Sequence, residues 1–230
     1  MNKAKISEIF QSIQGEGQYL GVKQVFIRFF ECNMYCAWCD TPRSTGDEEG
    51  HFEEYTSDEL WRKISGLWSN CHSISFTGGE PLIQKDFIKA FLPRLKAAWV
   101  TSYLETNGVF YQELAELIDD IDIIAMDLKL PSSTKCRPFW EEHKEFLKVA
   151  RKKEVFTKAV ISCDTTREDV LESVELVAGI DPEITYILQP NYFDHENGVV
   201  RKCLEYQKDC SNRLKNVRII PQMHKFLKLR

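Results

Sequence analysis

The sequence predicts an α/β protein built on a largely parallel sheet, and three observations support this. Short runs rich in β-branched and aromatic residues recur along the chain, and amphipathic stretches of helical length separate them. Alternation of this kind is typical of parallel βαβ units. No linker, repeat or low-complexity tract interrupts residues 1–230, a length that suits a single domain with a substantial core.

Seven short segments carry the strand pattern. They are Gln24–Phe30, Ser73–Phe76, Val100–Leu104, Ile121–Met126, Val155–Ile161, Ile184–Leu188 and Val217–Ile220. This number of strands fits either an open doubly wound sheet or an incomplete, TIM-like barrel of about six parallel strands with helices outside. Periodicity by itself does not choose between the two.

Helical patterns fill the intervals between these strands. Thr56 and Glu59 have the spacing of a capping box, so we expect a helix that opens there and runs through Trp68. Pro93 should bend or shorten the following helix, because proline lacks the N–H that a helix interior uses. Further helices are predicted at Asp86–Ala97, Tyr111–Ile118, Phe139–Ala150, Arg167–Ala178 and Val199–Cys210, with a crossover loop at Pro131–Lys135.

Composition and charge exclude several classes of function. Apolar residues make up 43% of the chain and charged residues 28%, which is ordinary for a soluble globular protein. The net charge of −5 argues against a general nucleic-acid-binding protein, which needs a basic face. The first ten residues lack the apolar core of a signal peptide, and no segment has the length needed to cross a bilayer. We therefore expect a protein of the reducing cytoplasm that binds neither nucleic acid nor membrane.

The most informative residues are Cys32, Cys36 and Cys39, which follow the first predicted strand, with Trp38 just before the third. Three thiolates can hold three irons of a [4Fe-4S] cube. The fourth iron then stays free to bind a small chelating molecule and pass it an electron. A cluster that only carries electrons normally has four cysteine ligands. The odd number of cysteines therefore indicates a reactive cluster.

Two other interpretations of these cysteines are weaker. A structural zinc site needs a fourth cysteine or histidine at a second short spacing, and His51 stands alone. A disulfide framework does not fit this chain either, because 8 cysteines in 230 residues are too few for a small secreted protein held together by disulfides.

Polar segments follow five of the predicted strands at the point where each strand ends. Because the carboxyl ends of parallel strands meet at one edge of a sheet, we expect these segments to form one pocket. They are Cys32–Thr41, Thr77–Pro81, Glu105–Gly108, Asp127–Lys129 and Gln189–Pro190.

Two of these segments, together with Glu105, suit a ligand that carries amine, carboxylate and hydroxyl groups. The glycines of the Gly78–Glu80 segment let peptide groups approach a ligand closely, although a plain turn is the alternative. Glu105, Asp127 and Lys129 are charges at strand ends that could hold an adenosyl amino acid, or could form ion pairs with one another. Lys158 has two possible roles at this stage: it could bind a carboxylate, or it could be a strand residue exposed to solvent.

A second set of residues suits a carboxylated heterocycle. In the Ile13–Gly17 segment, the amide of Gln14 and the carboxylate of Glu16 can read alternating donors and acceptors, although a plain loop is the alternative. Arg28 lies within an apolar strand and needs an anionic partner, either a substrate carboxylate or an acidic side chain such as Glu31.

Three further residues have two interpretations each. Asp40 and Thr41 directly follow the third cysteine, and a carboxylate with a hydroxyl suits Mg2+, although an aspartate often caps a turn. His224 follows the last predicted strand and could contact a substrate or cap that strand.

Taken together, these segments resemble the radical S-adenosylmethionine (SAM) superfamily and, within it, the 7-carboxy-7-deazaguanine synthase family, over essentially the whole chain. The cysteine triad and the Gly78–Pro81 turn mark the superfamily. Gln14–Gly17, Cys39–Thr41 and Gln222–Lys225 mark the family. In one departure, many members carry Ser-Pro-Lys where this chain has Asp127–Lys129.

The resemblance implies a fold, an activity and partners. It implies an incomplete α/β barrel that forms a homodimer. It implies the conversion of 6-carboxy-5,6,7,8-tetrahydropterin to 7-carboxy-7-deazaguanine by radical ring contraction with loss of ammonia, a step in queuosine and related deazapurine biosynthesis. The expected cofactors are a [4Fe-4S] cluster, SAM and Mg2+. The expected electron source is an external reductant such as flavodoxin or ferredoxin.

The resemblance also assigns roles by matching position. Cys32, Cys36 and Cys39 would hold the cluster, and Thr41, with Asp40 beside it, would bind Mg2+. The residues expected around SAM are Trp38, Gly79, Glu80, Glu105, Asp127, Lys129 and Gln189. Those expected to face the pterin are Ile13, Gln14, Gly15, Glu16, Arg28 (on its carboxylate), Thr77, His224 and the terminal Arg230.

Two alternatives remain at the level of the sequence. A glycyl-radical activase is also a radical SAM enzyme, and Asp-x-Lys occurs in such enzymes, but its protein substrate would not need Arg28 and Gln14–Glu16 in a closed pocket. A non-enzymatic iron-sulfur or zinc module would need neither the Gly78–Pro81 rim nor an open iron.

Overall fold

The strands form one mixed, mostly parallel sheet. In the computed structural model, which describes residues 3–46 and 50–229, a nine-stranded sheet has the order β3-β1-β2-β4-β5-β6-β7-β8-β9. From β2 to β9 every neighbouring pair is parallel, whereas β1 is antiparallel to both β2 and β3. The bounds are β1 (Lys3–Ile13), β2 (Lys23–Phe29), β3 (Glu53–Thr56), β4 (Ser73–Gly78), β5 (Ser102–Thr106), β6 (Ile123–Asp127), β7 (Glu154–Ile161), β8 (Tyr186–Pro190) and β9 (Val217–Ile219).

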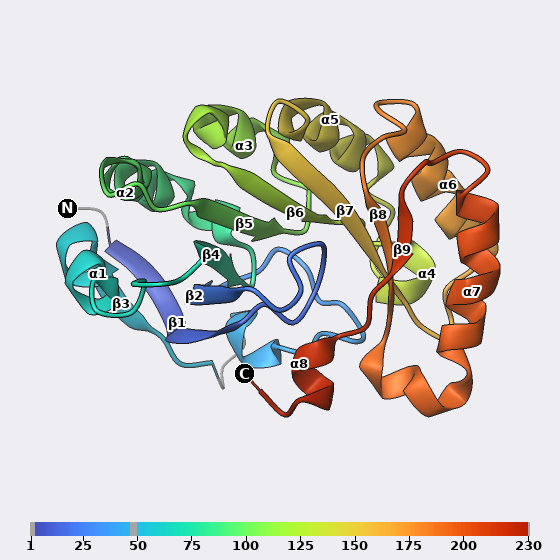
Figure 1. Cartoon of the computed structure of the whole chain (residues 1–230), viewed down its shortest axis with the longest axis horizontal. Helices are drawn as coiled ribbons and strands as arrows, with labels where there is room; N and C mark the ends of the chain where they lie inside the picture. The colour runs from blue at the N-terminus through green and yellow to red at the C-terminus, as the bar shows by residue number, and fades with distance from the viewer. Residues whose placement is uncertain (1–2, 47–49, 230) are drawn as a thin grey trace.

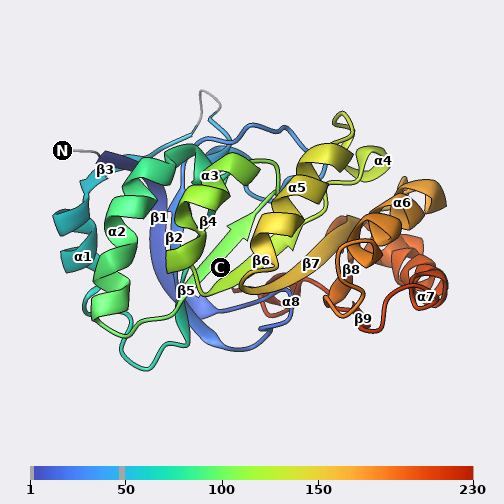
Figure 2. The same ribbon diagram turned by 90° about the horizontal axis from the view of Figure 1, so that it is seen from above.

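The sheet curves without closing, and the helices lie mainly outside it. Its two edges are β3 and β9 within the described ranges, so the predicted incomplete barrel is confirmed. Figure 1 shows the larger helices along the convex side and α8 near the open side, and Figure 2 shows α2, α3, α5 and α6 lying across the outer face. The helices are α1 (Ser57–Ile64), α2 (Lys85–Ala97), α3 (Tyr111–Leu117), α4 (Pro131–Thr134), α5 (Trp140–Ala150), α6 (Arg167–Ala178), α7 (Val199–Cys210) and α8 (Met223–Phe226).

Several strands end later in the sequence than predicted. The strands β4, β5 and β8 extend two residues beyond their predicted ends, and β6 extends one. Backbone hydrogen bonds to parallel neighbours continue there, although the side chains become polar. The first polar groups of the site therefore stand on the strands themselves and not on loops. The strands β1 and β3 were not predicted.

The helix predictions are largely correct, with three differences. The capping box is present, because Glu59 N donates to Thr56 Oγ1 (3.3 Å) and Thr56 N donates to Glu59 Oε2 (2.8 Å). However, α1 ends at Ile64 and does not reach Trp68. The helix α2 continues past Pro93 to Ala97, so this proline does not shorten it. Part of the predicted crossover loop forms the short helix α4, which starts at Pro131.

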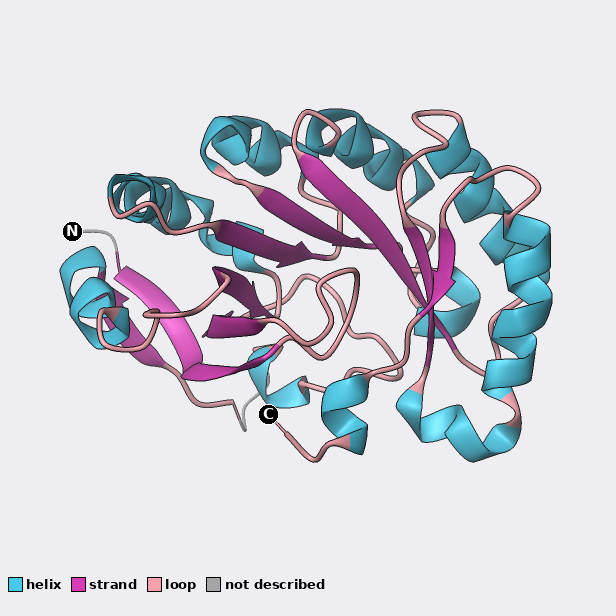
Figure 3. Ribbon diagram, viewed as in Figure 1, coloured by secondary structure: helices cyan, strands magenta, loops and turns pink. Residues whose placement is uncertain are grey.

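Apolar side chains fill both faces of the sheet. On the convex face, Phe29 is fully buried, with ring centroids 6.1 Å from Phe76 and 6.4 Å from Phe87. On the concave face, Tyr103, Phe156 and neighbouring side chains form a smaller cluster. Figure 3 shows that loops and α8, in addition to strands, lie on this inner side.

The alternation of side chains along a strand links this inner cluster to the polar groups above it. Residues i and i+2 of a strand point to the same face. Tyr103 therefore shares its face with Glu105, and Phe156 shares its face with Lys158. The apolar cluster closes the bottom of the barrel, and the polar side chains stand at its mouth. In the part of the chain that the structure describes, no helix is long and apolar enough to cross a membrane.

Candidate active site

A cavity opens at the carboxyl ends of the parallel strands, as expected for this fold. Segments that are far apart in the sequence, from the end of β1 to α8, meet around it. The structure thus gathers almost all of the predicted site residues in one place. Those that line it are Ile13, Gln14, Gly15, Glu16, Arg28, Cys32, Cys36, Trp38, Cys39, Asp40, Thr41, Thr77, Gly79, Glu105, Asp127, Lys129, Gln189 and His224.

The loop with the three cysteines is fixed by contacts to a distant segment. Ala37 N donates to Thr134 O (2.9 Å), and Trp38 Nε1 donates to Ser133 Oγ (2.8 Å). The Lys129 ammonium lies 4.9 Å from the centroid of the Trp38 ring. The helix α4 and the end of β6 therefore hold this loop against the mouth of the barrel.

The thiols of this loop fit an iron-sulfur cluster. Burial raises the pKa of Cys36 to about 12 and also raises the pKa of Cys32, so these sulfurs need a metal charge to become thiolates. Among the described residues, these two and Cys39 are the cysteines that line the cavity. The thiol of Cys136 instead contacts Tyr35 O at 3.7 Å, outside that lining. The donor set is therefore three sulfurs, as a cluster with one open iron requires.

Gly78 and Gly79 allow two segments of the backbone to lie in close contact. A Cβ on Gly79 would lie 2.1 Å from Glu31 O, and one on Gly78, whose φ is +128°, would lie 2.3 Å from Phe29 O. The turn after β4 must therefore pass directly over the end of β2. It brings the Gly79 peptide to the cavity wall beside the cysteine loop.

The Glu80 side chain turns away from the cavity and does not line it in the described structure. It is fully buried and accepts hydrogen bonds from Leu82 N (3.0 Å), Thr106 Oγ1 (2.9 Å) and Asn107 N (2.8 Å). Burial raises its pKa to about 7. Glu80 thus ties the turn after β4 to the end of β5, and it is not among the described residues that line the cavity.

A chain of alternating charges crosses the floor of the cavity. Lys129 Nζ lies 2.9 Å from Asp127 Oδ2, and Lys158 Nζ lies 3.3 Å from Asp127 Oδ1. Lys158 also donates to Glu16 Oε2. Burial opposes ionisation of the two acids, but the lysines outweigh it and hold the pKa of Asp127 and of Glu16 below their usual values. Lys158 was not assigned to the site from the sequence.

Glu105 lies with the residues expected around the pterin. It accepts hydrogen bonds from Gln14 Nε2 (2.6 Å) and Thr77 Oγ1 (2.8 Å). Burial raises its pKa, and the charge of Lys158 only partly offsets this effect. The sequence placed Glu105 beside SAM, whereas in the structure it joins two side chains of the other set.

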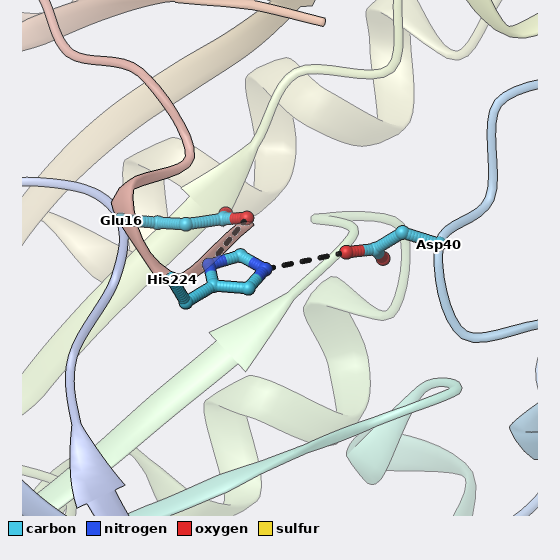
Figure 4. Close-up of side chains that lie close together, drawn as sticks. All are labelled: Glu16, Asp40 and His224. Atoms are coloured by element: carbon cyan, nitrogen blue, oxygen red, sulfur yellow. Dashed lines mark ion pairs between the residues drawn. The ribbon is translucent and has the colours of Figure 1, made fainter. Parts of the chain in front are cut away.

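The segment after β1, the cysteine loop and the start of α8 meet at the rim. His224 lies between two acids, with Nδ1 4.0 Å from Glu16 Oε1 and Nε2 3.7 Å from Asp40 Oδ2 (Figure 4). Lys225 Nζ lies 3.3 Å from the same Asp40 oxygen. Gly15 permits this arrangement, because a Cβ there would lie 2.5 Å from the His224 side chain.

Gln222, which the sequence analysis left without an individual role, strengthens this junction. It is buried, and its Nε2 donates to Glu16 Oε1 (2.9 Å), while its Oε1 accepts from Tyr192 N (3.2 Å). The signals for this residue in the sequence are its place two positions before His224 and its part in the Gln222–Lys225 segment. The other predicted residue of this end, Arg230, lies outside the described residues.

The Mg2+ prediction rests on oxygen donors that are present at the rim. Thr41 Oγ1 lies 4.0 Å from Cys39 Sγ, directly beside the cysteine loop. One ligand atom each of Glu16, Asp40 and His224 lies within 4.8 Å of the others. Lys225 and His224 lower the pKa of Asp40 against the effect of burial, so this carboxylate is ionised. A carboxylate and a hydroxyl are donors that suit Mg2+.

Arg28 has a partner other than the one considered from the sequence. Its Nε donates to Glu8 Oε2 (3.0 Å), a residue in register with it on β1, and its guanidinium lies 5.6 Å from the centroid of the Phe10 ring. Glu31 is paired with Lys5 instead (2.6 Å). This pair uses the Nε of Arg28, and the residue also lines the cavity, where the rest of the guanidinium can bind another anion.

Gln189 carries a buried acceptor that no described residue satisfies. The residue is 1% exposed, and its Oε1 has no hydrogen-bond partner among the described residues. A buried amide oxygen without a partner is costly, and at a cavity wall it indicates a ligand that donates to it. SAM offers such donors in its amine, hydroxyl and adenine groups.

Comparisons with known proteins give a consistent result. A family model described as the Radical SAM superfamily matches residues 26–177. The chain is 37% identical to the 7-carboxy-7-deazaguanine synthase of Geobacter sulfurreducens over 97% of each chain. It is 32% identical to that of Archaeoglobus fulgidus, covering 99% of this chain and all of the relative. The crystal structure of QueE from Escherichia coli shares the fold, with a TM-score of 0.67 at 21% identity, covering 96% of this chain and 95% of that one.

Proposed function

Because this chain belongs to the 7-carboxy-7-deazaguanine synthase family of the radical SAM superfamily, we propose how its cavity carries out the family's reaction. The enzyme is a radical SAM lyase that converts 6-carboxy-5,6,7,8-tetrahydropterin to 7-carboxy-7-deazaguanine, with loss of ammonia, in queuosine and related deazapurine biosynthesis. A [4Fe-4S] cluster and SAM, as in the superfamily, supply the electron and the 5′-deoxyadenosyl radical that start this chemistry.

In this proposal Cys32, Cys36 and Cys39 hold the cluster at one end of the cavity. Gly79, Trp38, Asp127, Lys129 and Gln189 surround SAM. The lysine ammonium balances the SAM carboxylate, and the amide oxygen of Gln189 accepts a hydrogen bond that it otherwise lacks. Glu80 supports this subsite from behind through the hydrogen bonds that fix the two neighbouring turns.

The pterin occupies the other end. Arg28 binds its carboxylate, and Gln14 and Glu16 read the donors and acceptors of its ring, with Thr77 and His224 at the edges. Ile13 and Gly15 contribute backbone and apolar surface, and we assign the terminal Arg230 to this end by family resemblance alone. Mg2+ binds Thr41, with Asp40 close by, and draws further oxygens from substrate and water.

We extend the proposal to the whole protein. The described strands form one continuous sheet, which supports a single domain over residues 1–230. Family resemblance supports a homodimer that works in the cytoplasm with an external reductant such as flavodoxin or ferredoxin.

The observation that carries this proposal is that one cavity holds the cysteine thiols together with Gln14, Glu16 and Arg28. The test is an anaerobic incubation of the reconstituted protein with SAM, reductant, Mg2+ and the carboxytetrahydropterin. Mass analysis should find the deazaguanine acid. A protein that cleaves SAM but leaves the pterin unchanged would contradict the assignment.

The cysteine assignment has a matched control. Cys36→Ala should lose iron and SAM cleavage, whereas Cys163→Ala, at an exposed cysteine, should keep both. Retained cleavage in Cys36→Ala would remove the basis for the cluster.

A further inference from the structure

We propose that Lys158 is a positioning residue that fixes the Glu16 carboxylate for recognition of the pterin ring. This inference rests on the proposed function and adds to it a residue of β7 that neither the family resemblance nor the cysteine pattern assigns. It starts from the contacts of Lys158 on the floor of the cavity.

Lys158 lies between the proposed SAM end and the proposed pterin end of the cavity. Its side chain is 9% exposed, and it faces Glu16 on the segment after β1 and Asp127 on the neighbouring strand β6. Lys158 and Asp127 are direct partners in the parallel register of the two strands. The backbone of the sheet therefore sets where the Lys158 side chain begins, independently of the segment that carries Glu16.

Asp127 does not need Lys158 to be neutralised. Lys129 Nζ already lies 2.9 Å from its other oxygen. Glu16 is different, because the remaining described contacts of its carboxylate are the neutral amide of Gln222 (2.9 Å) and the His224 ring at 4.0 Å. Among the described residues, Lys158 is the lysine or arginine paired with Glu16. If Lys158 only stabilised the sheet through Asp127, it would not need the contact with Glu16.

The backbone of the segment that carries Glu16 is already held, because Met223 N donates to Gly15 O (2.8 Å) and Glu16 N donates to Gln14 Oε1 (3.0 Å). The contact with Lys158 therefore acts on the carboxylate. Glu16 stands between Gly15 and Gly17, and Gly17 has a φ of +70°. Glycine lowers the cost of such a conformation. Lys158 holds one oxygen of Glu16 and Gln222 the other. The carboxylate is thus oriented before a substrate arrives, which reduces the entropy lost on binding.

The test separates substrate binding from cleavage of SAM. We expect Lys158→Met, which keeps length but removes charge, to raise the KM for the carboxytetrahydropterin about tenfold, while kcat and abortive SAM cleavage change less than about threefold. Lys158→Arg should recover much of the lost affinity, because it restores a cation. Lys215→Met is the control, since it removes an exposed lysine paired with Glu183 and should change nothing.

A double variant keeps the test valid if the single variant folds poorly. Glu16→Gln/Lys158→Met removes both members of the pair, so that no buried charge loses its partner at that contact. If Lys158 acts through Glu16, the double variant should have the KM of Glu16→Gln alone. Iron content and thermal unfolding of each variant would report on folding separately.

The outcomes distinguish this inference from the function on which it rests. An unchanged KM in Lys158→Met overturns the inference, and so does an equal loss of affinity from this change with and without Glu16→Gln. Either result leaves the proposed function intact. A wild-type protein that holds its cluster and cleaves SAM without converting the pterin overturns both.

Discussion

At the scale of single residues, the cavity is defined by how its charges are balanced. Asp127, Glu16 and Asp40 each face at least one cation, and the cations hold their pKa values low although burial opposes it. Glu105 and Glu80 lack an ion pair in the described structure, and burial raises their pKa. Acidic side chains therefore have two different electrostatic roles in one site.

Arg28 gives the first prediction at this scale. Arg28→Ala should weaken pterin binding by about 1.5–3 kcal/mol, the usual scale for a lost charged hydrogen bond, while SAM cleavage survives. Binding titrations with the pterin measure this. Glu8→Gln removes the partner of Arg28 outside the site and should not weaken binding. Unchanged affinity in Arg28→Ala would make the arginine purely structural.

Thr41 gives the second prediction. Thr41→Ala should raise the Mg2+ concentration needed for half-maximal turnover without changing the iron content, because the hydroxyl lies beside the cysteine loop but is not a cluster donor. Thr41→Ser keeps the hydroxyl and should behave as wild type. Metal titration of the turnover rate, with iron analysis alongside, checks both statements. Loss of iron in Thr41→Ala would show that the residue supports the cluster loop.

At the scale of elements, the ends of the strands decide the site. Apolar runs in the sequence predicted where most parallel strands lie, because a strand buried on both faces has a nearly continuous apolar pattern. The strand β3 was missed because Glu53–Thr56 is short and polar. The strand β1 was missed because polar residues are interspersed among its apolar ones, and because its pairing has an irregularity between Ile6 and Glu8.

The helix α5 provides a prediction about pH. His143 is fully buried, its Nε2–H donates to Asn107 O (3.1 Å), and burial lowers its pKa to about 4. In the unfolded chain it takes up a proton near its ordinary pKa of about 6.5. As the pH falls below that value, protons bind the unfolded state first, so the free energy of unfolding decreases. Between pH 7.5 and 5 we expect this residue to remove about 2 kcal/mol of stability.

Chemical denaturation of the cluster-loaded protein under nitrogen at several pH values measures this effect. His143→Gln removes the titrating ring. The loss of unfolding free energy between pH 7.5 and 5 should then be smaller by about 2 kcal/mol, whatever the substitution costs in stability at neutral pH. A slope that is the same in both proteins would show that other groups cause it.

At the scale of the whole molecule, the core between sheet and helices supports the cavity. Phe29 is fully buried where β2 meets α2, just before the cysteine loop. Phe29→Ala should cost about 3–5 kcal/mol of unfolding free energy, because a large ring leaves a cavity. Trp99→Ala, at a side chain that is 96% exposed, should change stability by less than about 0.5 kcal/mol. Denaturant unfolding of both variants tests this, and equal costs would contradict the packing described.

The sequence by itself determined the class of fold, most strands and helices, and which residues are candidates for the site. Local patterns carry these features: apolar runs, the Thr56–Glu59 cap and the spacing of three cysteines. The tertiary structure decided which of these residues face one another. It placed Glu105 against Gln14, turned Glu80 behind the wall, and paired Lys158 with Glu16 across 142 positions of the chain. Such pairings depend on strand register and on the curvature of the sheet, which are set by packing over the whole molecule and leave no local signal in the sequence.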